Sequence, residues 1–267
     1  MMVYRSAGEI PVGIVSVVAV GLFDGLHLGH LTVIERALSI ARSKKLDTIV
    51  LTFDITESAH PSAKRTDNRL LTPTSFESTL GGMGVGAVVR LSFESIRMLT
   101  DREFAQDILV DLLGAQAVCC GENFRFGRGA AGDIAALHRF GEELGFSTEV
   151  LPLASYQREI ISSTRIRACV EKGELEAAAA MLGRPYSFDF AAVFLDDNTL
   201  MQELPQGYVE PPAGRCSSTV NINGQRFPAF SRIFASDSGI LLCETRTEAP
   251  IANLSGASSV IELISYL

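Results

Sequence analysis

A mostly apolar run from Ile14 to Val20 leads directly into a segment rich in glycine and histidine. The run is dense in β-branched valine, which favours a buried strand. Residues 21–30 follow it and read Gly-Leu-Phe-Asp-Gly-Leu-His-Leu-Gly-His. Helical spacing begins next, with Val33, Ile34, Ala37, Leu38 and Ala41 on one face. A strand that turns directly into a helix is the building unit of a parallel α/β sheet, so this feature predicts an α/β fold.

Strands and helices alternate onward to about residue 150, which predicts a Rossmann-like parallel sheet. The expected later strands are 48–53, 87–92, 117–120 and 149–151. Thr100 and Glu103 form a capping-box pattern, and the helix that they open places Phe104, Ile108, Leu109 and Leu112 inward before Gly114 ends it. Asp133 is expected to cap another helix, which ends near Gly145. The irregular stretch 54–72 is too long for an ordinary connection and suggests a functional loop.

Beyond Pro185 the pattern changes to short β-type segments, 190–195, 218–222, 240–243 and 260–267, separated by turn sequences. Such segments predict a small antiparallel β domain, either a barrel or a sheet. We therefore expect an α/β domain over 1–186 and a small β domain over 187–267.

Charge and cysteine usage restrict the partners and the compartment. The net charge of −8 argues against nucleic acid or an anionic membrane as the main partner. The five cysteines include no Cys-x-x-Cys pair, which is typical of a reduced, cytoplasmic protein. The apolar stretch 10–23 is too short to span a bilayer. We expect a cytoplasmic protein that binds neither nucleic acid nor membrane.

His27 and His30 lie where the first expected strand gives way to a helix. The backbone N–H groups at a helix N-terminus attract anions, and imidazoles add further donors. The pair therefore suggests a site for nucleotide phosphates. The alternative is a loop that contains two histidines by chance.

The segment 121–127, Gly-Glu-Asn-Phe-Arg-Phe-Gly, follows the 117–120 strand and should share the sheet edge of the His27 loop. In extended backbone, Phe124 and Phe126 point to one side and Asn123 and Arg125 to the other. One side suits an aromatic pocket and the other a phosphate or metal. The alternative is a loop pinned in the core by the two phenylalanines.

A second possible anion site lies in the segment 161–167, Ile-Ser-Ser-Thr-Arg-Ile-Arg, which opens a helix. Ser163 and Arg167 share a face, with Thr164 close to it. Hydroxyls and an arginine at a helix N-terminus favour anion binding. The alternative is that Ser162 or Ser163 is an ordinary N-cap and that the arginines are solvated.

These three motifs, in this order, resemble those of the bacterial FAD synthetase family, the bifunctional riboflavin kinase and FMN adenylyltransferase enzymes of the HxGH nucleotidyltransferase superfamily. Leu182-Gly-Arg-Pro-Tyr186 also matches the family's domain junction, so the resemblance covers residues 14 to about 187. It implies transfer of AMP from ATP to FMN, giving FAD and pyrophosphate, with Mg²⁺ accompanying ATP.

The resemblance also implies roles for individual residues. The implied catalytic residues are His27, His30 and Asn123; those at the ATP phosphates are Gly21, Phe23, Gly29, Ser163, Thr164 and Arg167; those at the flavin are Asp54, Phe124 and Phe126. The chain is expected to supply no metal site of its own. Phe53 and Asp54 match the start of the family's Phe-x-Pro-His-Pro segment, but the sequence then departs from it, which leaves the role of His60 open.

The β domain occupies the place of the family's riboflavin kinase domain but lacks the kinase signature Pro-Thr-Ala-Asn. We therefore expect FMN adenylyltransferase activity without riboflavin kinase activity. Two alternatives stay open: a nucleotidyltransferase for another phosphorylated vitamin or metabolite, and a regulatory protein that binds flavin or nucleotide without catalysis.

Overall fold

The computed structural model describes residues 1–54, 68–191, 193–222, 224–251 and 258–267, and the chain forms two compact units. The first unit consists of Met1–Thr66 and Glu77–Ile160, and the second of Asp67–Phe76 and Ile161–Leu267. Each unit groups residues that contact one another in space. The domain boundary expected between residues 186 and 187 stays a prediction.

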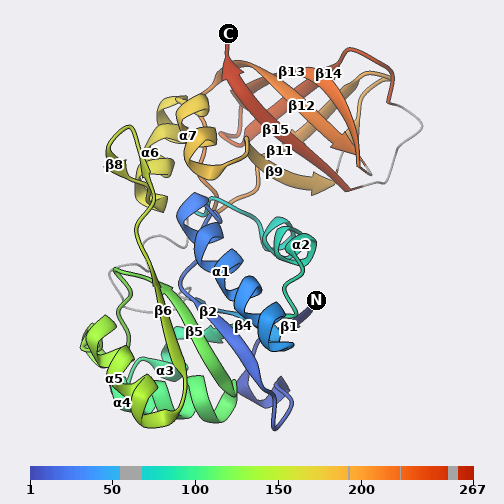
Figure 1. The fold of residues 1–267 in the computed structure, drawn as a ribbon. Helices are drawn as coiled ribbons and strands as arrows, with labels where there is room; N and C mark the ends of the chain where they lie inside the picture. The colour runs from blue at the N-terminus through green and yellow to red at the C-terminus, as the bar shows by residue number, and fades with distance from the viewer. Residues whose placement is uncertain (55–67, 192, 223, 252–257) are drawn as a thin grey trace. The chain divides into compact units, whose positions relative to one another are not determined.

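The first unit is built on a six-stranded parallel sheet with the order β1-β4-β3-β2-β5-β6 (Figure 1). Its strands are β1 (Met2–Tyr4), β2 (Ser16–Val20), β3 (Asp47–Asp54), β4 (Ala87–Ser92), β5 (Ala115–Gly121) and β6 (Ser147–Leu151). The expected Rossmann-like parallel sheet is confirmed. Strand β3, which follows β2 in the chain, lies on one side of β2, and β5 lies on the other side. The strand order therefore reverses at β2.

The expectation that the Ile14–Val20 run is the first strand was wrong, because β1 precedes it and pairs with β4 at the sheet edge. Three residues are too few to show an alternating pattern. Within the run, the paired strand begins only at Ser16, and its five residues are all buried.

Helices flank this sheet, and none in the described ranges is long and apolar enough to cross a bilayer. They are α1 (Leu28–Lys44), α2 (Pro73–Met83), α3 (Phe93–Ile96), α4 (Asp101–Glu103), the π-helix η3 (Phe104–Leu112), α5 (Ile134–Leu144) and the single 3₁₀ turns η1 (Ala7–Glu9) and η4 (Arg128–Ala130). The five apolar residues predicted to share a face of α1 are all buried. Asp133 caps α5 as expected, and its carboxylate accepts from the N–H of Ala136 at 2.9 Å. Helix α2 was not expected from the sequence.

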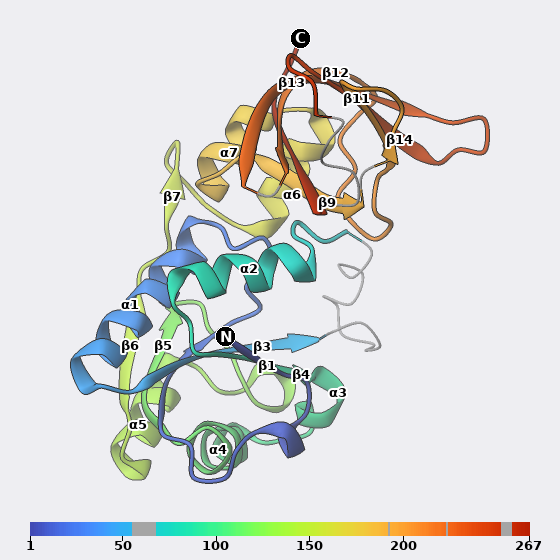
Figure 2. The same ribbon diagram turned by 90° about the vertical axis from the view of Figure 1, so that its right-hand side faces the viewer.

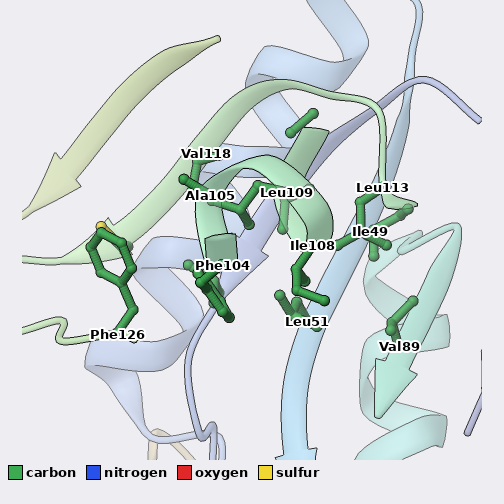
Figure 3. Close-up of a cluster of buried hydrophobic side chains, with 14 of the residues drawn as sticks. Ile49, Leu51, Val89, Phe104, Ala105, Ile108, Leu109, Leu113, Val118 and Phe126 are labelled. Carbon is green, nitrogen blue, oxygen red and sulfur yellow. The ribbon is translucent and has the colours of Figure 1, made fainter. Parts of the chain in front are cut away.

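The capping box at Thr100 and Glu103 is confirmed, but the helix that it opens continues as a π-helix. The N–H of Leu113 donates to the carbonyl of Ile108, five residues earlier, at 3.2 Å. This wider winding fully buries Leu113, whereas Leu112, predicted to point inward, is only partly buried. Figure 3 shows the resulting core, in which Phe104 and Ile108 gather with strand residues such as Leu51.

Gly114 ends this helix with a backbone that other residues adopt only at a cost, since its φ is +56°. A Cβ atom at this position would lie 1.8 Å from the carbonyl oxygen of Ile14. The glycine therefore allows the segment before β2 to pass directly over the start of β5.

The second unit contains a seven-stranded antiparallel sheet with the order β10-β11-β14-β13-β12-β15-β9. Its strands are β9 (Tyr186–Ala191), β10 (Val193–Phe194), β11 (Thr199–Glu203), β12 (Gly214–Ile222), β13 (Gln225–Ala235), β14 (Leu241–Thr247) and β15 (Ser258–Tyr266). The small antiparallel β domain is confirmed, although β11 and β13 were not among the expected strands. Helices α6 (Ser163–Lys172) and α7 (Leu175–Leu182) pack together, with α7 against β9 and β15 (Figure 2). A short hairpin, β7 (Ser155–Tyr156) and β8 (Glu159–Ile160), precedes them at the end of the first unit.

Candidate functional site

The loop that follows β2 has an unusual backbone that the underlying core holds in place. Phe23 and Leu26, both non-glycine residues, have φ values of 48° and 43°. Each left-handed residue of this kind costs about 1–2 kcal/mol. Both side chains are almost completely buried, and Thr52 donates its hydroxyl to the carbonyl of Leu22 at 3.0 Å. Burial of the two side chains offsets the backbone cost, so the loop presents its end in a fixed conformation.

His27 forms the N-cap of α1. Its Nδ1 atom accepts a hydrogen bond from the backbone N–H of His30 at 3.3 Å. A neutral imidazole whose Nδ1 accepts must carry its proton on Nε2, and we assign this tautomer. The Nε2–H group of His27 is then a donor at the positive end of a 17-residue helix.

The rings of His27 and His30 are stacked, with their centroids 3.5 Å apart and an interplanar angle of 17°. Phe23 packs edge-on against His30 at 5.4 Å. Burial, and then the neighbouring His27, hold the pKa of His30 well below the ordinary histidine value. His30 is therefore neutral at pH 7, and no residue in the described part of the chain bonds its buried Nδ1. Two stacked imidazoles beside a helix N-terminus form a compact site for an anion.

Gly29 lies against the ring of His27. A Cβ atom on Gly29 would be 3.3 Å from Cε1 and 3.4 Å from Nδ1 of that ring. A Cβ on Gly21 would similarly lie 3.2 Å from the ring of Phe23. The two glycines thus allow the close packing on which the positions of these rings depend.

Asn123 lies in the loop after β5, and this loop begins at the same sheet edge as the His27 loop. Strands β2 and β5 are paired directly, with Ala19 opposite Cys119. Asp54 ends β3, the neighbour of β2 on the other side. The carboxyl ends of these strands meet where the strand order reverses, the usual ligand position in open α/β sheets. The structure therefore places His27, Asn123 and Asp54 at the same edge of the sheet.

Phe124 and Phe126 point to one side, as predicted, and their rings stack with centroids 5.6 Å apart. Phe126 is only 5% exposed and packs against Phe104 and Phe140, so this ring belongs to the core. The packing alternative therefore holds for Phe126, and a flavin contact of either ring stays a prediction. Arg125 is exposed and pairs with Asp133 at 3.4 Å.

The third motif lies in the second unit, at the start of α6. Ser162 is the N-cap, and its hydroxyl accepts from the N–H of Arg165 at 3.2 Å, so the N-cap alternative holds for this serine. Ser163 and Thr164 form the first turn. Arg167 is 8% exposed, and its Nε donates to the carbonyl of Asn68 at 2.7 Å.

Sequence reasoning missed Asn68, which is 99 positions from Arg167 along the chain. No local pattern marks such a contact, since it depends on how the chain returns to α6. His60 lies outside the described residues.

No group of three histidine, cysteine, aspartate or glutamate side chains in the described ranges is arranged to hold a metal ion. The five cysteines are buried thiols. Burial raises the pKa of Cys119, Cys120 and Cys216 to about 12, so these thiols are poor nucleophiles at pH 7.

The fold has a counterpart among solved structures. A crystal structure described as a macrolide-efflux protein from Streptococcus pneumoniae superposes with a TM-score of 0.86, covering 100% of this chain and 90% of that one. The two sequences are 22% identical, so this likeness shows the fold alone.

Two curated relatives are named bifunctional riboflavin kinase/FMN adenylyltransferase. The relative from Pseudomonas fluorescens is 30% identical over 226 residues, which cover 81% of this chain and 72% of that protein. The relative from Buchnera aphidicola subsp. Schizaphis graminum is 29% identical over 174 residues, which cover 64% of this chain and 56% of that protein. The family model for FAD synthetase matches residues 12–165, more than half of the chain. The resemblance seen in the motifs is confirmed, and this protein belongs to the FAD synthetase family.

Proposed function

We propose that this protein transfers the AMP portion of ATP to FMN, producing FAD and pyrophosphate. The observation that carries the proposal is the stacked pair of imidazoles at the N-terminus of α1. This pair lies at the reversal of strand order in a chain of the FAD synthetase family. We place the reaction in the cytoplasm, as the cysteine usage suggests, with ATP and FMN or FAD as the partners.

The reaction forms one bond and breaks one. An oxygen of the FMN phosphate attacks the α-phosphorus of ATP, and the bond from that phosphorus to the oxygen bridging to the β-phosphate breaks. The attacking oxygen is already ionised at pH 7, so no general base is required. The protein's task is to align the two phosphates and to stabilise the charge that grows on the leaving pyrophosphate.

The residues of the first unit suit the transferring phosphate. The Nε2–H of His27 and the backbone N–H groups of α1 would donate to its oxygens. His30, kept neutral by burial and by its neighbour, gains a favourable interaction with an anion if it becomes protonated as ATP binds. Asn123 offers an amide at the neighbouring strand end. Gly21, Phe23 and Gly29 keep the loop backbone close to the nucleotide.

The pyrophosphate portion of ATP would bind Ser163, Thr164 and Arg167, at the first turn of α6. Buried arginine is suited to such a group because its guanidinium forms paired hydrogen bonds with phosphate oxygens. The flavin would lie near Asp54, Phe124 and Phe126.

ATP-dependent transfer of this kind indicates a divalent metal, which we propose to be Mg²⁺ bound with ATP. Mg²⁺ retains several waters and commonly binds substrate phosphates with only one or two protein groups. In this arrangement Asn123, just after β5, would provide an oxygen ligand for the ion. When bound, the ion would neutralise phosphate charge as the bond to pyrophosphate breaks.

The test is incubation of the protein with ATP, Mg²⁺ and FMN, followed by chromatography of the flavins. FAD and pyrophosphate should form in equal amounts. No FAD from folded protein would overturn the proposal. Binding of FMN or ATP without product would then favour the regulatory alternative, and AMP transfer to a different phosphorylated compound would favour another substrate.

Substitution tests the assigned roles. His30→Ala and Arg167→Ala should each reduce turnover about a hundredfold, the usual loss of roughly 3 kcal/mol when one donor to transition-state charge is removed. His138→Ala, at an exposed histidine on α5, is the matched control and should retain full activity. Near-normal turnover in a site variant would show that its residue is structural.

A further inference from the structure

Asn68 is hydrogen-bonded to α6 through both its backbone and its side chain. Its carbonyl accepts from Nε of Arg167 at 2.7 Å, and its side-chain Nδ2 donates to Oε1 of Glu171 at 2.8 Å. Arg167 and Glu171 are four residues apart, so they occupy one face of the helix. Asn68 thus bridges the helical turn that carries the arginine assigned to pyrophosphate.

The backbone that follows Asn68 is itself anchored within the second unit. The N–H of Arg69 donates to the carbonyl of Gly207, and its own carbonyl accepts from the N–H of Val209, each at 2.9 Å. Further along, the hydroxyls of Thr72 and Ser75 both donate to Oδ1 of Asp189. The Asn68 carbonyl that accepts from Arg167 therefore belongs to an extended segment that backbone hydrogen bonds hold in place.

This arrangement determines what Arg167 offers to a ligand. Because Nε is bonded to Asn68, any bond from Arg167 to phosphate must come from its Nη groups. An unrestrained arginine side chain loses about 2 kcal/mol of rotamer entropy when a ligand fixes it in one conformation. The bond from Nε to Asn68 means that part of this loss has already occurred on folding, before a ligand binds.

We propose that Asn68 and Glu171 are positioning residues for Arg167. Glu171 holds the Asn68 side chain, Asn68 presents its carbonyl to Nε, and the guanidinium is oriented for the pyrophosphate portion of ATP. This inference rests on the proposed adenylyl transfer, in which Arg167 binds the leaving group.

Removal of the Glu171 carboxylate distinguishes a positioning role from a purely electrostatic one, because the two roles predict opposite changes in the affinity for an anion. Deletion of a negative charge one helical turn from an anion site should tighten anion binding through space. If Glu171 acts by holding Asn68, Glu171→Ala should instead weaken binding of Mg-pyrophosphate, measured by calorimetry, by about threefold to tenfold. Glu171→Gln keeps an acceptor for Asn68 and should preserve affinity. Glu176→Ala removes the same charge from α7 and is the matched control.

Asn68→Ala should reproduce the loss, and the double variant Asn68→Ala with Glu171→Ala should be no worse than either single variant. Thermal unfolding of each variant checks that the fold is retained. If Glu171→Ala binds pyrophosphate as tightly as the parent or more tightly, the positioning role is refuted while adenylyl transfer stands. If the parent binds no pyrophosphate, the phosphate role of Arg167 fails and this inference fails with it.

Discussion

Gly29→Ala is expected to separate activity from stability. Gly29 is in the first turn of α1, where alanine has the better helix propensity by up to about 1 kcal/mol. Its new Cβ would lie 3.3 Å from Cε1 of His27, closer than an ordinary contact, so that ring must shift by a few tenths of an ångström. The same ring stacks on His30 at 3.5 Å and accepts its N–H, so both imidazoles are affected.

Small displacements of positioned donors reduce catalysis strongly, and a misplacement of about 1 Å can cost a hundredfold. For this smaller shift we expect turnover to fall about tenfold, equivalent to about 1.4 kcal/mol of transition-state stabilisation. The free energy of unfolding should change by less than about 1 kcal/mol, because the gain in helix propensity and the close contact oppose each other.

The assay is the rate of FAD formation under saturating ATP and FMN, together with urea unfolding of the same samples. Gly82→Ala is the matched control, since Gly82 is also helical and a Cβ there would have no atom within 4 Å. The control should retain activity. Turnover of Gly29→Ala within twofold of the parent would refute the idea that the position of the His27 ring limits the reaction.

Three further predictions concern pH, the backbone and the second activity. The folded pKa of His30 is depressed, so its contribution to stability is present above pH 6.5 and is lost as the pH falls toward the folded pKa, by at most about 1.4 kcal/mol per pH unit. Urea unfolding at several pH values should show this loss, and His30→Gln should reduce it; an unchanged pH dependence would contradict the assignment. Gly114→Ala should destabilise the fold by about 3 kcal/mol or more, whereas Gly13→Ala, also at positive φ but with open space, should cost only about 1–2 kcal/mol, and equal losses would show that the contact with Ile14 is unimportant. Riboflavin with ATP and Mg²⁺ should remain unphosphorylated, since the Pro-Thr-Ala-Asn signature is absent, and any FMN or FAD formed from riboflavin, seen by chromatography, would reveal a divergent kinase site.

Much of the fold could be predicted because its signals are local. The valine-rich run and the apolar face of α1 reflect periodicity within a few residues, and the capping box at Thr100 and the cap at Asp133 are contacts three residues apart. The π-helix could not be predicted from the sequence, because its winding depends on the packing of Leu113 in the core beneath the sheet. The short β1 escaped because its assignment depends on pairing with β4, far along the chain.

The sequence alone determined the fold class, the family and the three candidate phosphate motifs, since each is carried by residues that are neighbours along the chain. Tertiary structure decided which of those residues have which chemical state and partner. The buried stack that keeps His30 neutral, the core position of Phe126 and the attachment of Asn68 to Arg167 all depend on segments that meet only in the folded chain. Burial and hydrogen bonding change with surroundings, and these surroundings come from residues too distant in sequence for any local pattern to specify.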